Sequence, residues 1–222
     1  MYVFLALGAA AIASLLVALF LGKRDWDGLL LNLGTEMLGA WLTYALFEFF
    51  IGRAEKQEED RAKEADDKAR LITQMRSLVR DVAVPAVDEL RRRGWLCDGS
   101  LRRANLASAN LSGARLSNAD LSKAVLPAAD LSEAQLGKAN LREAYLVSAN
   151  LCGAYLYAAN LAGANLTRAN LKGARLMKAN LEGASLMKAN LKGAKVNFRK
   201  LTQAKSLAGA ILPNGVKLAS GD

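Results

Sequence analysis

The second half of the chain repeats every five residues, and this period constrains the fold more than any other feature. Every fifth residue from Ala104 to Ala194 is alanine, nineteen in succession. Leucine follows two places after the alanine in every repeat from Leu106 to Leu191. An internal repeat this regular must be interpreted before any local propensity.

A five-residue period excludes an α-helix. Five residues advance about 500° around a helix, so successive leucines would spread over all of its faces. In a straight strand, the alanine and leucine of one repeat share a side, but an odd period places the next leucine on the opposite side. A corner must therefore redirect the chain in every repeat. Glycines stand two places after leucine, where a turn with positive φ favours them: Gly113, Gly153, Gly163, Gly173, Gly183 and Gly193.

Repeats such as ANLAS, ADLSK and ANLKG resemble the consensus A(D/N)LXX of the pentapeptide-repeat family. The resemblance implies a right-handed quadrilateral parallel β-helix with four repeats per coil, with leucine and alanine inside. About five coils, spaced by ~4.8 Å, would make a rod ~25 Å tall. We expect the polar residue before leucine to bond to the turn backbone rather than form a ligand ladder, as at Asn110, Asp130, Asn150, Asn170 and Asn190.

The ends of such a solenoid need caps. Trp95 and Leu96 stand where they would cover the first coil, and Arg199 breaks the alanine pattern near the other end. Pro213, Asn214 and Gly215 are expected to close the domain. The predicted organisation is a transmembrane helical hairpin, a cytoplasmic helical linker, a capped β-helix and a tail, at 1–52, 53–94, 95–216 and 217–222.

Two apolar segments near the beginning of the chain, 2–22 and 28–51, predict the hairpin. Residues 2–22 carry no charge and, at ~1.5 Å per residue, could cross a ~30 Å hydrocarbon layer. A cleaved signal peptide is the alternative for 2–22, but a basic n-region is absent and a second span follows. The segments NLGTEMLGAWLTY and RRRGWLCDGSLRRANL also resemble the front of membrane-anchored bacterial pentapeptide-repeat proteins.

Two alternative roles are predicted for the polar residues within 28–51. Asn32 and Glu36 lie four apart on one helix stripe, where they would hydrogen-bond between helices or, for Glu36, line an ion or proton path. Lysine and arginine are more abundant after residue 52 than in the loop at 23–27. That asymmetry predicts an integral protein of the bacterial inner or an internal membrane, with the repeat domain in the cytoplasm.

The linker begins with a charged, helix-favouring stretch at 53–70. Apolar residues then follow at a and d spacing within 71–82: Leu71, Met75, Leu78 and Val82. They predict either homo-oligomerisation or packing onto the chain's own next segment. Pro85 should end or kink this helix, with a short helix at 86–93 after it.

The residue types give no support for catalysis or for a cofactor. The chain has no histidine, so the usual general base and the commonest neutral metal ligand are missing. Cys97 and Cys152 are far apart and fit neither a zinc site nor a disulfide framework. No nucleophile and base pair, metal cluster or phosphate loop is evident. We therefore expect a non-enzymatic protein with no cofactor and no metal.

The charge is concentrated in the repeats. Residues 101–222 hold 17 Lys and Arg against 6 acids, whereas residues 1–100 hold 13 against 15. A basic surface favours anionic partners, which are acidic proteins, anionic lipid headgroups or nucleic acid. Nucleic acid is disfavoured because no recognition motif accompanies the charge. Topoisomerase inhibition by DNA mimicry, known in soluble family members, needs an acidic rod and is disfavoured as well.

With four repeats per coil, outward residues twenty apart stack on one face. The predicted partner-binding face combines aromatic and basic side chains, the types favoured at binding hot spots: Arg115, Gln135, Lys138, Tyr155, Tyr157, Arg175, Met177, Lys178 and Lys195. The opposite face is more apolar: Val125, Pro127, Tyr145, Val147, Arg168 and Met187. The sequence thus predicts a membrane-anchored scaffold that docks a protein partner, or alternatively an oligomeric membrane protein with an ion path through Glu36.

Overall fold

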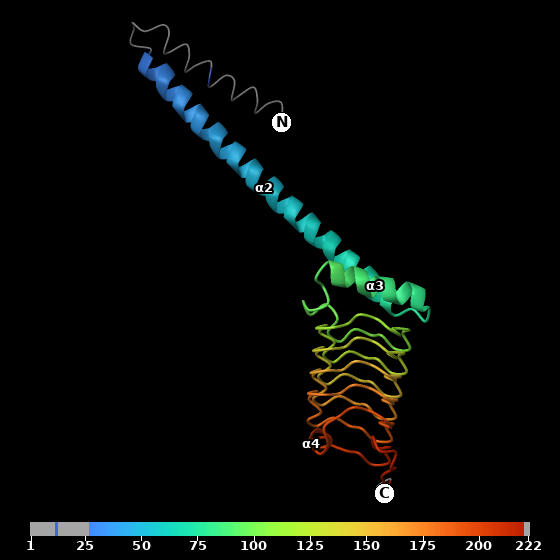
Figure 1. Ribbon diagram of the computed structural model, residues 1–222. Coiled ribbons are helices and arrows are strands. Elements are labelled where there is room, and N and C mark those ends of the chain that lie inside the picture. The colour runs from blue at the N-terminus through green and yellow to red at the C-terminus, as the bar shows by residue number, and fades with distance from the viewer. Residues whose placement is uncertain (1–11, 13–26, 220–222) are drawn as a thin grey trace. The chain divides into compact units, whose positions relative to one another are not determined.

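The structure, a computed structural model, describes residue 12 and residues 27–219 (Figure 1). These residues contain three helices and a stack of five-residue repeats: α2 (Asp27–Met75), α3 (Arg80–Arg92) and α4 (Phe198–Leu201). The chain divides into two compact units, Met1–Glu64 and Ala65–Asp222. Except for Ile12, the predicted span at 2–22 lies outside the described residues.

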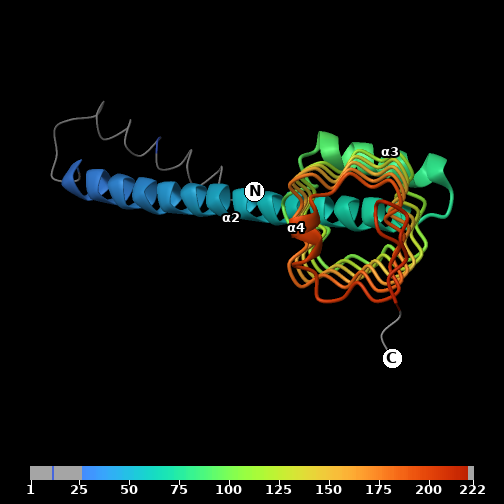
Figure 2. The same ribbon diagram turned by 60° about the horizontal axis from the view of Figure 1, so that its bottom comes forward.

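The repeats of the second unit wind into a four-sided coil, seen along its axis in Figure 2. Parallel bridges join residues twenty apart, as in the series Arg115, Gln135, Tyr155, Arg175. This register confirms that four repeats make one coil. Backbone pairing between coils is limited to single β-bridges at the residue before leucine. In the described repeats, these isolated bridges replace the longer strands found in most parallel sheets.

Leucine and alanine fill the interior of the coil. The leucines from Leu101 to Leu191 have no exposed surface, and neither do the alanines at every fifth position from Ala109 to Ala189. Each leucine contributes ~1.5–3 kcal/mol by burial relative to full exposure. The predicted core is therefore confirmed, and all other positions of the repeat are left for the surface.

The corners follow from the two residues after each leucine. The second of them has a positive φ, which is 68° at Gly153 and 58° at Lys138. The polar residue before leucine secures the corner, since Asn150 Oδ1 accepts a hydrogen bond from Cys152 N at 3.3 Å. Its amide also donates to Asp130 Oδ1 in the preceding coil at 2.9 Å. The asparagine ladder thus has the backbone role that the sequence predicts.

The end of α2 and the whole of α3 pack against the first coil. Leu71, Met75, Val87 and Leu90 are buried in the same core as the leucines of the repeats. The backbone N–H of Asn110 donates to the carbonyl of Ser77 at 2.9 Å, which ties the loop between the helices to the coil. These contacts show that the first part of the apolar 71–82 pattern packs onto the chain itself.

The exposure of the later apolar residues of that pattern, and the position of Pro85, differ from the prediction. Leu78 and Val82 are 70% and 44% exposed, so the a and d face is not continuous. The helix breaks after Met75, and α3 runs through Pro85 instead of ending there. The break turns the chain back, so that α2 and α3 both contribute side chains to the core.

The prediction of a membrane span at 28–51 is wrong. Among the residues that the structure describes, no helix is both long enough and apolar enough to cross a membrane. Within α2, the apolar run is interrupted by Asn32, Glu36 and Glu48, and the helix continues without a break into the charged stretch that follows. The predicted integral membrane location depended on this span and is corrected with it.

The far end of the coil is closed by α4 and a tight turn. Asn197 Oδ1 accepts a hydrogen bond from Arg199 N at 2.9 Å and so caps α4. Arg199 lies inside this helix, which explains the loss of the alanine pattern. At Pro213–Gly215 the chain reverses, and Ile211 pairs antiparallel with Lys217.

Candidate functional site

The candidate site occupies one side of the coil and brings the predicted partner-binding residues together. Its centre is the ladder formed by Arg115, Gln135, Tyr155, Arg175 and Lys195, which lie in successive coils. The corner that follows this ladder adds residues 117–118, 137–138, 157–158 and 177–178. We call this ladder and its corner the Tyr155 face.

Two tyrosines stack at the middle of the Tyr155 face. The ring centroids of Tyr155 and Tyr157 are 6.1 Å apart, and the ring planes differ by 14°. Tyr155 points outward from the ladder, with 41% of its surface exposed. Tyr157 comes from the neighbouring corner of the same repeat and is half-buried. The pair presents a flat aromatic surface that is held in place on a rigid coil.

Lys178 and Met177, from the next coil, border the aromatic pair. The Lys178 ammonium lies 5.4 Å from the centroid of the Tyr157 ring, within the range of a cation–π interaction. A hydrogen bond with the Tyr157 hydroxyl raises the pKa of Lys178. Met177 is 46% exposed beside it and adds a flexible apolar contact.

The Tyr155 face is basic. It carries five cationic side chains and no carboxylate: Arg115, Lys138, Arg175, Lys178 and Lys195. None of the five makes an ion pair with any residue that the structure describes. All five are exposed, so their charge is available to an anionic partner.

The more apolar face predicted opposite is also present. Val125 and Tyr145 pair in adjacent coils, and Tyr145 and Met187 are 43% and 39% exposed. Among the described residues its tyrosine has no aromatic partner, and Arg168 is the only cation among the residues predicted for it. This face therefore lacks the combination of aromatic pair and charge found on the Tyr155 face.

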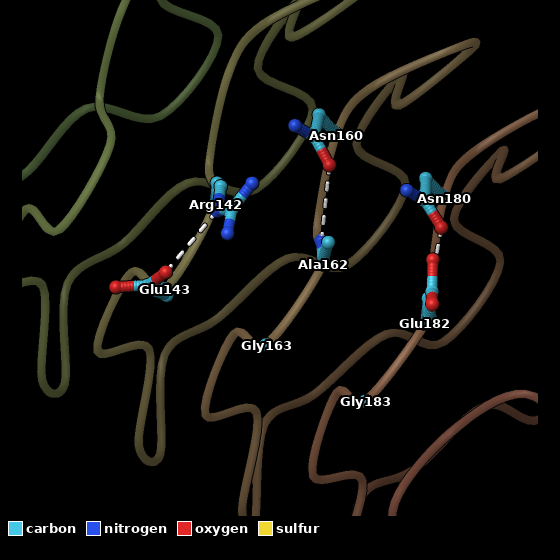
Figure 3. Close-up of a pocket in the computed structure, with 8 residues that line it drawn as sticks. All are labelled: Arg142, Glu143, Asn160, Ala162, Gly163, Asn180, Glu182 and Gly183. Atoms are coloured by element: carbon cyan, nitrogen blue, oxygen red, sulfur yellow. Dashed lines mark hydrogen bonds and ion pairs between the residues drawn. The ribbon is translucent and has the colours of Figure 1, made fainter.

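A hollow of about 420 Å³ lies on a third side of the coil (Figure 3). Gly163 and Gly183 open it by lacking side chains. Some of its polar groups are bonded to one another, since Arg142 Nε donates to Glu143 Oε1 at 3.1 Å and Asn160 Oδ1 accepts from Ala162 N at 3.2 Å. The lining pairs Arg142 with Glu143 and adds a second carboxylate, Glu182, so this hollow lacks the unpaired positive charge of the Tyr155 face.

Of the two polar residues predicted for a membrane path, Asn32 and Glu36, the structure describes only the side chain of Glu36. Glu36 is exposed on α2. Farther along α2, the Tyr44 hydroxyl donates to a Glu48 carboxylate oxygen, and this hydrogen bond raises the pKa of Tyr44. The side chain of Asn32 lies outside the described part of α2. Among the described residues, no group of three or more His, Cys, Asp and Glu side chains could hold a metal ion.

The sequence missed one residue that borders the Tyr155 face. Arg91, near the end of α3, lines a hollow of about 370 Å³ together with Arg115 and Gln135. The run of three arginines at 91–93 was visible in the sequence, but nothing in it indicates which of them approaches the first coil. Cys97 lines the same hollow, and both Cys97 and Cys152 are free thiols.

The family model for pentapeptide repeats matches the chain in eight copies, over residues 100–136, 129–167 and 154–193. No curated protein matches the chain. Among solved structures, HetL, a pentapeptide repeat protein of heterocyst differentiation regulation from the cyanobacterium Nostoc, is 41% identical. The match covers 53% of this chain and 59% of HetL, with a TM-score of 0.31. This chain therefore spans little more than half the length of HetL.

Two further solved structures are similar to the chain. The protein alr5209, from Nostoc, is 34% identical, and the match covers 55% of this chain and 93% of alr5209, with a TM-score of 0.42. A protein from the Arabidopsis thaliana thylakoid lumen is 32% identical over 46% of this chain and 63% of its own, with a TM-score of 0.26.

Proposed function

The chain belongs to the pentapeptide-repeat family, whose members form right-handed quadrilateral β-helices, and we propose that it is a non-enzymatic scaffold that binds an acidic protein segment on the Tyr155 face. The observation that carries the proposal is the stacked pair of Tyr155 and Tyr157 among five cations without ion pairs. Stacked aromatics with neighbouring cations are the residue types that dominate binding energy at interfaces.

The geometry of the coil favours recognition with little loss of conformational freedom. The leucine core fixes the backbone beneath each outward residue, and the tyrosines have few rotatable bonds. A preformed surface loses less entropy on binding than a flexible one, so more of the contact energy appears as affinity. A partner in extended conformation could follow the ladder from Arg115 to Lys195.

The charge of the face selects the partner. Five cations without carboxylates attract an acidic segment and repel a basic one, which speeds association and sets specificity. The same sign of charge opposes a role as a mimic of nucleic acid. Binding should weaken as salt is added, because the cations are exposed and their fields are screened.

The test uses a photo-crosslinking residue at Tyr157 and, as control, at Asn160 in the neighbouring ladder. We expect one discrete acidic protein captured from Tyr157 and not from Asn160. Capture of the same set of proteins from both positions, or of lipid alone, would refute the Tyr155 face as the binding surface.

A pair of charge reversals then tests the face independently of the probe. Arg175→Glu with Lys178→Glu should abolish binding of the captured protein. Arg168→Glu with Lys188→Glu changes the net charge by the same amount on another corner of the coil and should leave most of the binding intact. Equal losses in the two double variants would show that only the overall charge matters.

A further inference from the structure

The three consecutive arginines at the end of α3 have different surroundings. Arg92 pairs with Glu89 at 2.5 Å, and Arg93 pairs with Glu89 at 2.6 Å and with Asp67 at 2.7 Å. Arg91 makes no ion pair with any described residue and lines the hollow of about 370 Å³ instead. Its charge is therefore not neutralised by an ion pair within the described residues.

A second unpaired guanidinium lines the same hollow. Arg115 is the first residue of the ladder in the Tyr155 face and has no carboxylate partner among the described residues. Arginine is the residue of choice for planar, bidentate contacts with carboxylate and phosphate oxygens. No acidic residue lines the hollow, so nothing there neutralises the two charges.

The end of α3 does not cancel this positive charge. A helix C-terminus carries a partial negative charge on its free carbonyls. Here two of those carbonyls accept backbone hydrogen bonds, since Trp95 N donates to Leu90 O at 2.8 Å and Gly94 N donates to Arg91 O at 3.1 Å. Gly94, with a φ of 74°, completes this Schellman motif and directs the chain into the first coil.

The remaining lining adds polar groups suited to an oxyanion. Asn118 and Gln135 also line the hollow, and their side-chain amides make no hydrogen bond with a described residue. Their N–H groups can donate to oxygen beside the guanidinium groups. The volume is within the range of sites for small ligands or single side chains.

We propose that this hollow binds a phosphomonoester, and that the group belongs to a phosphorylated side chain of the segment bound on the Tyr155 face. About two negative charges are needed to neutralise two unpaired guanidinium groups. A phosphomonoester carries about two at pH 7, whereas a single carboxylate carries one. The second part of this inference rests on the proposed function, because Arg115 and Gln135 belong to both the hollow and the ladder.

Cys97 provides a direct readout, because its exposed thiol lines the hollow. The protein is alkylated with N-ethylmaleimide, and the rates at Cys97 and at Cys152, which lies at a corner on another side of the coil, are followed by mass spectrometry. The probes are O-phospho-L-serine, inorganic phosphate, and an acidic peptide with one serine in its phosphorylated and unphosphorylated forms.

We expect the phosphorylated probes to slow alkylation of Cys97 and leave Cys152 unchanged. Arg91→Gln should weaken this protection about tenfold, as expected for the loss of charge-assisted hydrogen bonds. Arg92→Gln, the matched control, removes an adjacent arginine that does not line the hollow and should have no effect. The proposal is overturned if no phosphorylated probe protects Cys97, or if Arg91→Gln and Arg92→Gln behave alike.

Comparison of the four probes distinguishes failure of the phosphate site from failure of the proposed function. If phosphoserine and phosphate protect Cys97 but the peptide gains nothing over them, the hollow takes a small phosphomonoester and its link to the Tyr155 face is refuted. Much stronger protection by the phosphopeptide, lost in Arg175→Glu with Lys178→Glu, supports the link. If the unphosphorylated peptide binds as well as its phosphorylated form, the face functions and the phosphate site is refuted.

Discussion

The ring of Tyr155 lies directly over Gly137 of the preceding coil, where a Cβ on the glycine would be 3.0 Å from Tyr155 Cε1 and 3.3 Å from Cδ1. The corresponding positions in other coils hold Ser117, Tyr157 and Met177, so the corner itself accepts a side chain. The glycine is needed for Tyr155 alone. The position of the Tyr155 ring therefore depends on residues of two successive coils, Gly137 and Tyr155 itself.

Gly137→Ala should change stability with a sign that depends on Tyr155. With Tyr155 present, the new methyl group displaces the ring, and we expect a loss of about 1 kcal/mol. In a Tyr155→Gln background, the same change should stabilise by ~0.4–1 kcal/mol, because alanine has less freedom than glycine in the unfolded chain. Urea denaturation of the four proteins gives the coupling energy. A coupling near zero would show that the ring does not rest on Gly137.

Leu146→Ala should strongly destabilise the coil. Leu146 is in a central coil and has no exposed surface, so truncation leaves a cavity and should cost ~2–5 kcal/mol. Leu78→Ala is the control, since Leu78 is 70% exposed and its loss should cost less than about 0.5 kcal/mol. Denaturant unfolding measures both. Similar losses in the two variants would contradict the assignment of the core.

The repeat made the coil predictable because each residue of the five has one environment throughout. Alanine and leucine fix the inside, and the twenty-residue coil then fixes which outward residues meet, so Tyr155 and Arg175 were correctly placed together. No repeat covers the region before residue 100. There, the apolar pattern at 71–82 predicts either homo-oligomerisation or packing onto the chain, and only the structure shows that Leu71 and Met75 pack against the first coil while Leu78 and Val82 remain exposed.

Two other features depended on contacts that a sequence does not contain. The approach of Arg91 to Arg115 arises from the turn at Gly94, which brings the end of α3 beside the first coil. The span predicted at 28–51 was judged from its many apolar residues, but polar side chains within it lower its overall hydrophobicity. Hydropathy near the boundary between a span and an ordinary helix does not determine which of them forms.

Gly173→Ala and Ala158→Gly should have opposite effects on stability. Both residues occupy the left-handed corner position, with φ of 68° at Gly173 and 55° at Ala158. A Cβ at Gly173 would meet no atom within 4 Å, so alanine there causes no clash but introduces backbone strain of about 1 kcal/mol. Ala158→Gly relieves that strain and should be neutral or stabilising. Thermal unfolding of both variants tests this, and a stabilising Gly173→Ala would contradict it.

The charge cluster that joins the end of α2 to α3 should make the helical cap sensitive to acid. Arg93 pairs with Asp67 and Glu89, and its guanidinium carbon lies 4.8 Å from the centroid of the Trp95 ring. The hydrogen bond from Arg93 is the main cause that lowers the pKa of Asp67 below 3.8 and that of Glu89 below 4.5.

Because folding lowers these two pKa values, the stability they contribute is present above the ordinary values and is lost as the pH falls through the folded ones. Asp67→Asn should therefore be less stable than the parent protein at neutral pH, and the difference should shrink as the pH falls below 3.8. Asp88→Asn is the control, since Asp88 makes no ion pair with a described residue. Denaturant unfolding at a series of pH values provides the measurement. A difference between Asp67→Asn and the parent that stays constant down to the lowest pH would show that the Arg93 contact does not stabilise the cap.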